Sequence, residues 1–139
     1  MRTVTFADGF VSTSAPIVEG IEQETYNILN NQTNTSLFTI DSADYKSVFI
    51  DFELTRSDVS DSFLQTGSMV LYYDGTSWQY STLLTQGDDL IAASITLPEE
   101  VTISMVTALG VGTLRYSSGN MGASYAGKIR MIVSKVKVI

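Results

Sequence analysis

The chain has 139 residues, of which 44% are hydrophobic and 17% are charged, and its formal net charge at neutral pH is −7. This length and hydrophobic content indicate one domain with its own core rather than a disordered chain. The acidic balance argues against nucleic-acid binding, and the lack of histidine and cysteine excludes disulfides, His/Cys zinc sites and serine nucleophiles with a histidine base.

The first twenty residues read as a loop-like segment. Gly9, Pro16 and Gly20 punctuate it, so we expect at most a short edge strand at residues 3–6. The N-terminus lacks the apolar stretch of a secretory signal peptide, and no apolar run is long enough to span a bilayer. We therefore expect a protein made in the cytoplasm, with no signal peptide and no membrane insertion.

Strand-like runs follow. Residues 22–29 alternate loosely, and residues 36–40 form a second candidate strand. Residues 46–55 alternate strictly, which predicts a strand with one face in the core and one toward water. The apolar face of this strand consists of Val48, Ile50, Phe52 and Leu54. Residues 56–62 are charged and Ser-rich, so we expect a loop there.

The middle of the chain carries a hairpin signal. Asp74-Gly75 separates the apolar runs 67–73 and 76–83. A two-residue Asp-Gly between such runs is typical of a tight β-hairpin, because the turn needs positive φ at both positions. Turn signals at Gly87 and Pro98 then bound further runs at residues 90–97 and 101–108.

The last third of the chain predicts a pair of strands, residues 110–116 and 125–138, around Ser118-Gly119-Asn120. The alternation slips near Ser134, which indicates either a bulge or departure from the sheet. No helical periodicity appears. Short strands at regular spacing predict an all-β fold over residues 1–139, namely one antiparallel β-sandwich of jelly-roll-like form.

Acidic residues offer little chemistry. Asp51 and Glu53 share one strand face at about 6.6–7 Å, a spacing within reach of a glycosidase pair. Alternating acids are, however, the default on the outer face of an amphipathic strand. The loop aspartates lack the spacing of a calcium loop, and aspartate is common in turns. We expect no catalytic residue, no metal and no cofactor, hence no enzyme.

Four aromatic residues surround the predicted hairpin, and they are Tyr72, Tyr73, Trp78 and Tyr80. Aromatic rings stack on sugars and anchor protein interfaces. They also pair across strands and stabilise sheets, which is the interpretation that we favour. If a ring does stack on a sugar, Trp78 is the candidate.

Several stretches resemble the β-sandwich domains at the tips of bacteriophage tail fibres and tail needles. They are IDFELTR at 50–56, TGSMVLYYDG at 66–75, LRY at 114–116, then Gly119-Asn120 and the long last strand, which reads as a closing hairpin. The resemblance covers residues 47–139. It implies a jelly-roll-like knob that trimerises and touches the host surface.

This resemblance leads to a functional hypothesis. We expect a non-catalytic virion component that binds a host-surface glycan or outer-membrane receptor as a homotrimer, beside other virion proteins. The low charge and the apolar run at 131–139 leave surface for contact between chains. Receptor contacts are expected in loops at one end, residues 58–65 with Asp58 and Asp61, and residues 117–124 with Asn120. The alternatives are a capsid decoration or other virion structural protein and, third, a glycan-cleaving enzyme.

Overall fold

The computed structural model describes residues 4–5, 11–12 and 18–138. The strands in this part of the chain are β1 (Val4–Thr5), β2 (Val11–Ser12), β3 (Val18–Asn27), β4 (Thr35–Asp41), β5 (Tyr45–Ser57), β6 (Ser62–Tyr73), β7 (Trp78–Gly87), β8 (Val101–Ala108), β9 (Val111–Ser118) and β10 (Ala126–Lys137). None of the described residues belongs to a helix that could cross a membrane. β1 lies within the strand expected at 3–6, and β3 begins before the end of the expected loop-like segment. The rest of that segment lies outside the described residues.

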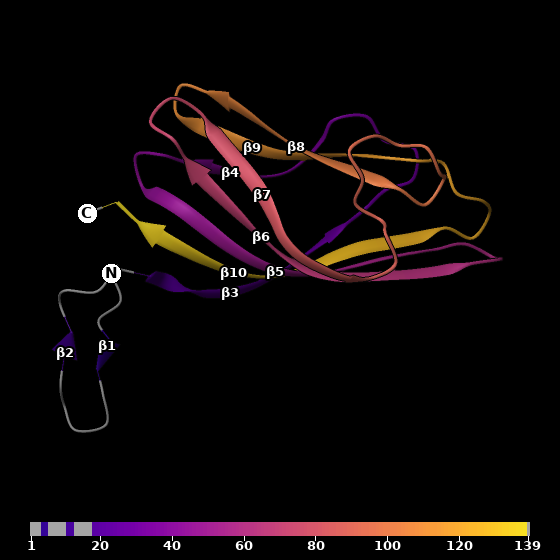
Figure 1. The fold of residues 1–139 in the computed structure, drawn as a ribbon, viewed down its shortest axis with the longest axis horizontal. Coiled ribbons are helices and arrows are strands. Elements are labelled where there is room, and N and C mark those ends of the chain that lie inside the picture. The colour runs from indigo at the N-terminus through magenta and orange to yellow at the C-terminus, as the bar shows by residue number, and fades with distance from the viewer. Residues whose placement is uncertain (1–3, 6–10, 13–17, 139) are drawn as a thin grey trace.

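Eight strands form two facing sheets. The larger sheet has the order β3-β10-β5-β6-β7 and the smaller β4-β9-β8, while β1 and β2 pair in a sheet of their own. All neighbouring strands run antiparallel. Figure 1 shows the two layers, with the core between them. The predicted antiparallel β-sandwich is confirmed. The chain alternates between sheets from β3 to β5 and from β9 to β10, whereas β5, β6 and β7 follow one another as a meander.

Strand β5 supplies the centre of the core. Its inward residues Val48, Ile50 and Leu54 are buried, as the alternation predicts. The strand is longer than expected and continues to Ser57, so that the buried face gains one more member, Arg56. The loop expected at 56–62 therefore begins later, at residue 58.

The last strand is central. β10 lies between β3 and β5, and its register with β3 shifts between Ser134 and Val136, so the slip in the sequence pattern is a bulge. The expected pairing of the last two strands is wrong, because β9 belongs to the smaller sheet, where it pairs with β4 and β8. Residues 119–125 thus cross from one sheet to the other, and the closing hairpin of the sequence resemblance is not formed.

The Asp74-Gly75 hairpin exists but its turn is longer than predicted. Tyr73 pairs with Trp78, and the turn closes from the Asp74 amide to the Ser77 carbonyl oxygen at 3.0 Å. Only Gly75 of the predicted pair has positive φ, at 100°. Asp74 instead uses its carboxylate, which accepts from the amides of Thr76 and Ser77.

Residues 90–97 do not form the expected strand. Leu90 is buried, but only Ile91 makes a bridge, to Val101. The segment is folded as a loop by Glu100, whose Oε1 accepts from the Thr96 amide at 2.8 Å and from the Leu97 amide at 2.6 Å. A hydrogen bond from the Thr96 hydroxyl is the largest cause of a lowered pKa of Glu100, and the hydrogen bonds from the two amides lower it further.

Candidate binding site

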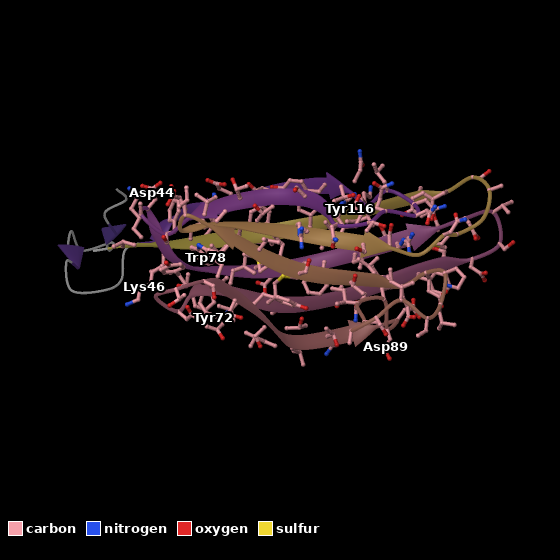
Figure 2. The ribbon with its side chains drawn as sticks, turned by 90° about the horizontal axis from the view of Figure 1, so that it is seen from above. Asp44, Lys46, Tyr72, Trp78, Asp89 and Tyr116 are labelled. Carbon is pink, nitrogen blue, oxygen red and sulfur yellow. The ribbon has the colours of Figure 1, made fainter. Side chains whose placement is uncertain are left out.

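Four connections meet at one end of the sandwich, which we call the loop end. They are residues 28–34, 58–61, 88–100 and 119–125. Figure 2 shows Tyr116 and Asp89 toward this end, with Asp44, Lys46, Tyr72 and Trp78 at the opposite end. The two loops that the sequence analysis singles out, 58–65 and 117–124, both reach the loop end, as expected of loops that share a rigid scaffold.

Arg56 holds the loop end together from inside. Its side chain is 0% exposed, and each N–H of its guanidinium has a partner. Nε donates to the Tyr125 hydroxyl at 3.0 Å. Nη1 donates to the carbonyl oxygens of Pro98 at 3.0 Å and Glu100 at 3.2 Å. Nη2 donates to Asn30 Oδ1 at 3.1 Å and to the carbonyl oxygen of Gly119 at 2.9 Å.

The buried charge of Arg56 is stabilised by dipoles rather than by a carboxylate. Its acceptors are three main-chain carbonyls, an amide oxygen and a phenol. Its guanidinium carbon also lies 5.1 Å from the centre of the Tyr125 ring, a cation–π contact. Arg56 is not among the site residues predicted from the sequence. The signal was present, because position 56 is the next inward position after 48, 50, 52 and 54.

Asp58 joins the two candidate loops. Its Oδ1 accepts from the amides of Ser60 and Asp61, both at 2.8 Å, and its Oδ2 accepts from the Gly122 amide at 3.0 Å. A main-chain bond from Val59 to Ala123, 2.9 Å, runs beside them. The hydrogen bonds from these backbone amides hold the pKa of the Asp58 carboxyl below its usual range, and the one from the Asp61 amide has the largest effect. The structure thus gives Asp58 a positioning role.

Asn120 lies at the same end and is exposed. Its Oδ1 accepts from Asn30 Nδ2 at 2.9 Å, and Asn30 Oδ1 accepts from the Met121 amide at 2.8 Å. Asn30 therefore connects the 119–125 loop to Arg56. The structure brings Asp58, Asp61 and Asn120 to one end of the molecule, as the loop hypothesis expects.

A groove opens next to these loops on the outer side of the larger sheet. It has a volume of about 430 Å³ and lies between the end of β3 and the end of β5, with β10 between them. Its lining residues are Asn27, Ile28, Leu29, Thr55, Ser57, Tyr125, Ala126, Gly127 and Lys128. The small side chains of β10 leave the space open. The lining offers amide, hydroxyl and ammonium groups together with exposed Leu29.

Tyr125 connects this groove to the buried arginine. Its hydroxyl accepts from Arg56 and donates to the carbonyl oxygen of Ile28. Burial is the main reason why the pKa of this hydroxyl is raised. Gly127 is required beneath it, since a Cβ there would lie 2.7 Å from the Ile28 carbonyl oxygen. The shape of the groove is thus set by bonds that reach into the core.

The four aromatic candidates lie away from this groove and do not form one platform. Trp78 is 2% exposed, and its Nε1 donates to the Gly110 carbonyl oxygen at 3.0 Å. It packs against Tyr73 with ring centres 5.7 Å apart, so this pair belongs to the core, and the hypothesis that Trp78 stacks on a sugar is wrong. Tyr72 and Tyr80 are both exposed but lie on opposite faces of the larger sheet. Tyr72 projects from its outer face, whereas Tyr80 lies opposite buried Leu71 and faces the smaller sheet.

The carboxylates do not gather into a metal site in the described part of the chain, where no three of His, Cys, Asp or Glu could hold one ion. Asp88 instead accepts from the Leu64 amide and Asp41 from the Ala43 amide, both at 2.9 Å. Asp51 and Glu53 lie on the outer face of β5, where Asp51 accepts from the Ser68 hydroxyl at 2.7 Å. An open hollow of about 280 Å³ adjoins them.

The fold and the loop end define a class, an all-β sandwich with ordered loops beside a polar groove. No protein-family model matches the chain, and no curated protein does. Among solved structures, it is similar to the tailspike protein of Acinetobacter phage vB_ApiP_P1, with 12% identity over 99% of this chain and 27% of that one, TM-score 0.42. It is also similar to the tailspike protein of Acinetobacter baumannii phage AM24, with 9% identity over 84% of this chain and 25% of that one, TM-score 0.32. The chain thus spans about a quarter of their length.

Proposed function

We propose that this chain is a non-catalytic binding module of a bacteriophage tail, and that it attaches the virion to a polysaccharide on the host surface. The resemblance of several sequence stretches to tail fibre and needle tips suggests the biological setting. The groove at the loop end supports the binding role, because it combines several hydrogen-bonding side chains with an adjacent apolar one, as ligand sites commonly do.

The observation that carries this proposal is the rigid support under the groove. Arg56 ties three of the connections at the loop end to one point, and Tyr125 extends that support to the groove wall. A site that is ordered before binding loses less conformational entropy when a ligand arrives. Thr55, Ser57 and Asn27 can exchange hydrogen bonds with sugar hydroxyls, and Lys128 can pair with an acidic sugar.

A homotrimer completes the proposal. Three copies would present three grooves to one cell surface, so that weak binding at each groove adds up to firm attachment through avidity. The same module would not cut the polysaccharide. Neither histidine nor cysteine is present in the sequence. Asp51 and Glu53 lie on the same outer face of β5 as Thr55 and Ser57 but do not line the groove, and alternating acids are the default on such a face.

The test is binding of the labelled purified protein to host cells, with competition against phage adsorption. Lys128→Glu should weaken binding at least tenfold, because it reverses the charge in the groove. Lys46→Glu is the matched control, since it makes the same charge change at the opposite end of the sandwich. Wild-type protein that neither binds host cells nor competes with the phage would refute the proposal and favour a virion structural role. An equal loss of binding in both variants would refute the assignment of the groove as the binding site.

A further inference from the structure

One side of the sandwich is bordered by two edge strands. β7 ends the larger sheet and β8 ends the smaller one, and the two lie near each other, since the Trp78 amide donates to Thr107 Oγ1 at 2.8 Å. In Figure 1, β7 rises from the lower layer toward the upper one. A hollow of about 510 Å³ opens between the strands, with Tyr80 on one wall and Met105 on the other.

This β7–β8 side lacks the usual protection of a strand edge. β7, with 10 residues, and β8, with 8, contain no charged residue and no proline. At the 17% charge of the whole chain, about three charged residues would be expected among these eighteen. Residues 79–87 are all exposed, including Leu83 and Leu84 at 61% each. Proteins normally blunt such edges with charges or proline, or cover them.

The opposite side of the same sandwich is protected, which makes the contrast an internal one. The edge strand β3 carries Glu22 and Glu24, and Glu22 pairs with Lys135 at 3.8 Å. The gap between β3 and β4 is closed by Tyr26 and Phe38, whose rings stack with centres 6.0 Å apart. The absence of charge is therefore specific to the β7–β8 side.

The charge of the chain indicates what covers this side. Two copies with a net charge of −7 each repel one another, and the repulsion is weakest where the approaching surfaces carry no charge. A partner selected by charge would require charged residues here, whereas a second copy of this chain brings the same uncharged surface. It also brings strand edges, whose main-chain groups can pair with those of β7 and β8.

We infer that the β7–β8 side is the contact surface between copies of this chain, an inference that rests on the homotrimer proposed above. Each copy offers two uncharged edges on one side. The β7 edge of one copy can meet the β8 edge of the next, and the homotrimer proposed above requires this contact to close into a ring after three copies. A closed ring leaves no uncharged edge exposed.

The experiment measures molar mass by light scattering at micromolar concentration. The wild type is expected at three times the chain mass of 15.2 kDa, and the double variant Leu83→Glu, Leu84→Glu is expected as a monomer. The matched control is Ile21→Glu with Ile132→Glu. It also replaces two exposed aliphatic side chains by glutamates, but on β3 and β10.

Circular dichroism checks that each variant keeps its sheet content. If the β7 double variant does not fold, Ser81→Glu on the same strand replaces it. A wild-type monomer or dimer overturns the inference, and so does a control that dissociates as readily as the β7 variant. Binding of the monomeric variant to host cells separates the two proposals. Weak residual binding leaves the binding role standing, whereas a wild-type trimer that does not bind refutes only that role.

Discussion

Replacing Arg56 by methionine tests the view that one buried side chain orders the loop end. Methionine fills similar space but donates nothing, so the Pro98 carbonyl oxygen loses its hydrogen-bond partner, whereas the carbonyl oxygens of Glu100 and Gly119 lose a charged donor but keep a main-chain amide each. Each unsatisfied buried group costs about 1–3 kcal/mol. Adding the four further hydrogen bonds from the charged donor, at roughly 0.5–1 kcal/mol each because burying the arginine charge is itself costly, we expect a total loss of about 3–5 kcal/mol.

The assay is urea unfolding followed by circular dichroism, with thermal unfolding as a second measure. At roughly 3–4 °C per kcal/mol for a chain of this size, the midpoint of thermal unfolding should fall by about 9–20 °C. Arg56→Lys keeps the charge but not the planar set of donors, so its stability should lie between those of the wild type and Arg56→Met. Arg130→Met is the control, because Arg130 is exposed on the outer face of the sheet and its loss should cost less than about 0.5 kcal/mol. A loss below about 1 kcal/mol for Arg56→Met would refute the reasoning.

Three further outcomes follow from the contacts. The folded-state pKa of Asp58 is lowered, so its contribution to stability is complete above its unfolded pKa of about 4 and disappears as the pH falls through the lower folded value. Asp58→Asn should therefore reduce the loss of stability at acidic pH when the free energy of unfolding is measured against pH. An unchanged loss of stability at acidic pH would contradict this. Gly112→Ala should destabilise the sandwich by about 2 kcal/mol or more in urea unfolding, because its Cβ would lie 2.5 Å from Trp78 Cγ, whereas a neutral effect would show that the ring can move. Asp51→Asn with Glu53→Gln should leave host-cell binding unchanged, and reducing-end assays should detect no cleavage by the wild type; cleavage that the double variant abolishes would establish the enzyme instead.

The sequence predicts much of the fold because the strands are amphipathic. The alternation in β5 predicts both the strand and its buried face. The slip near Ser134 predicts either a bulge or departure from the sheet, and β10 has the bulge. Pairing is harder to predict. A run such as 119–125 reads equally well as a hairpin turn and as a crossover between sheets, and only the packing of the whole sandwich decides between them.

The candidate site was predictable in part. The loops with Asp58 and Asn120 meet as expected, because both follow strands that end on the same side. The groove itself was not expected, since it depends on small residues at Ala126 and Gly127 lying between two neighbouring strands. Trp78 shows the limit of reasoning from residue type, because an aromatic ring suited to sugar stacking is equally suited to the core.

The central place of β10 has a consequence for how the chain acquires its structure. Asn27 at the end of β3 pairs with Lys128, about a hundred residues later, so β3 cannot join the sheet until nearly all of the sandwich has been synthesised. Contacts between residues so distant in sequence make folding slow, because the intervening chain must be ordered first. Until β10 arrives, β3 and β5 each present an unpaired edge. The nascent chain therefore passes through a stage in which these exposed strand edges can aggregate, unless chaperones or early association with another copy protect them.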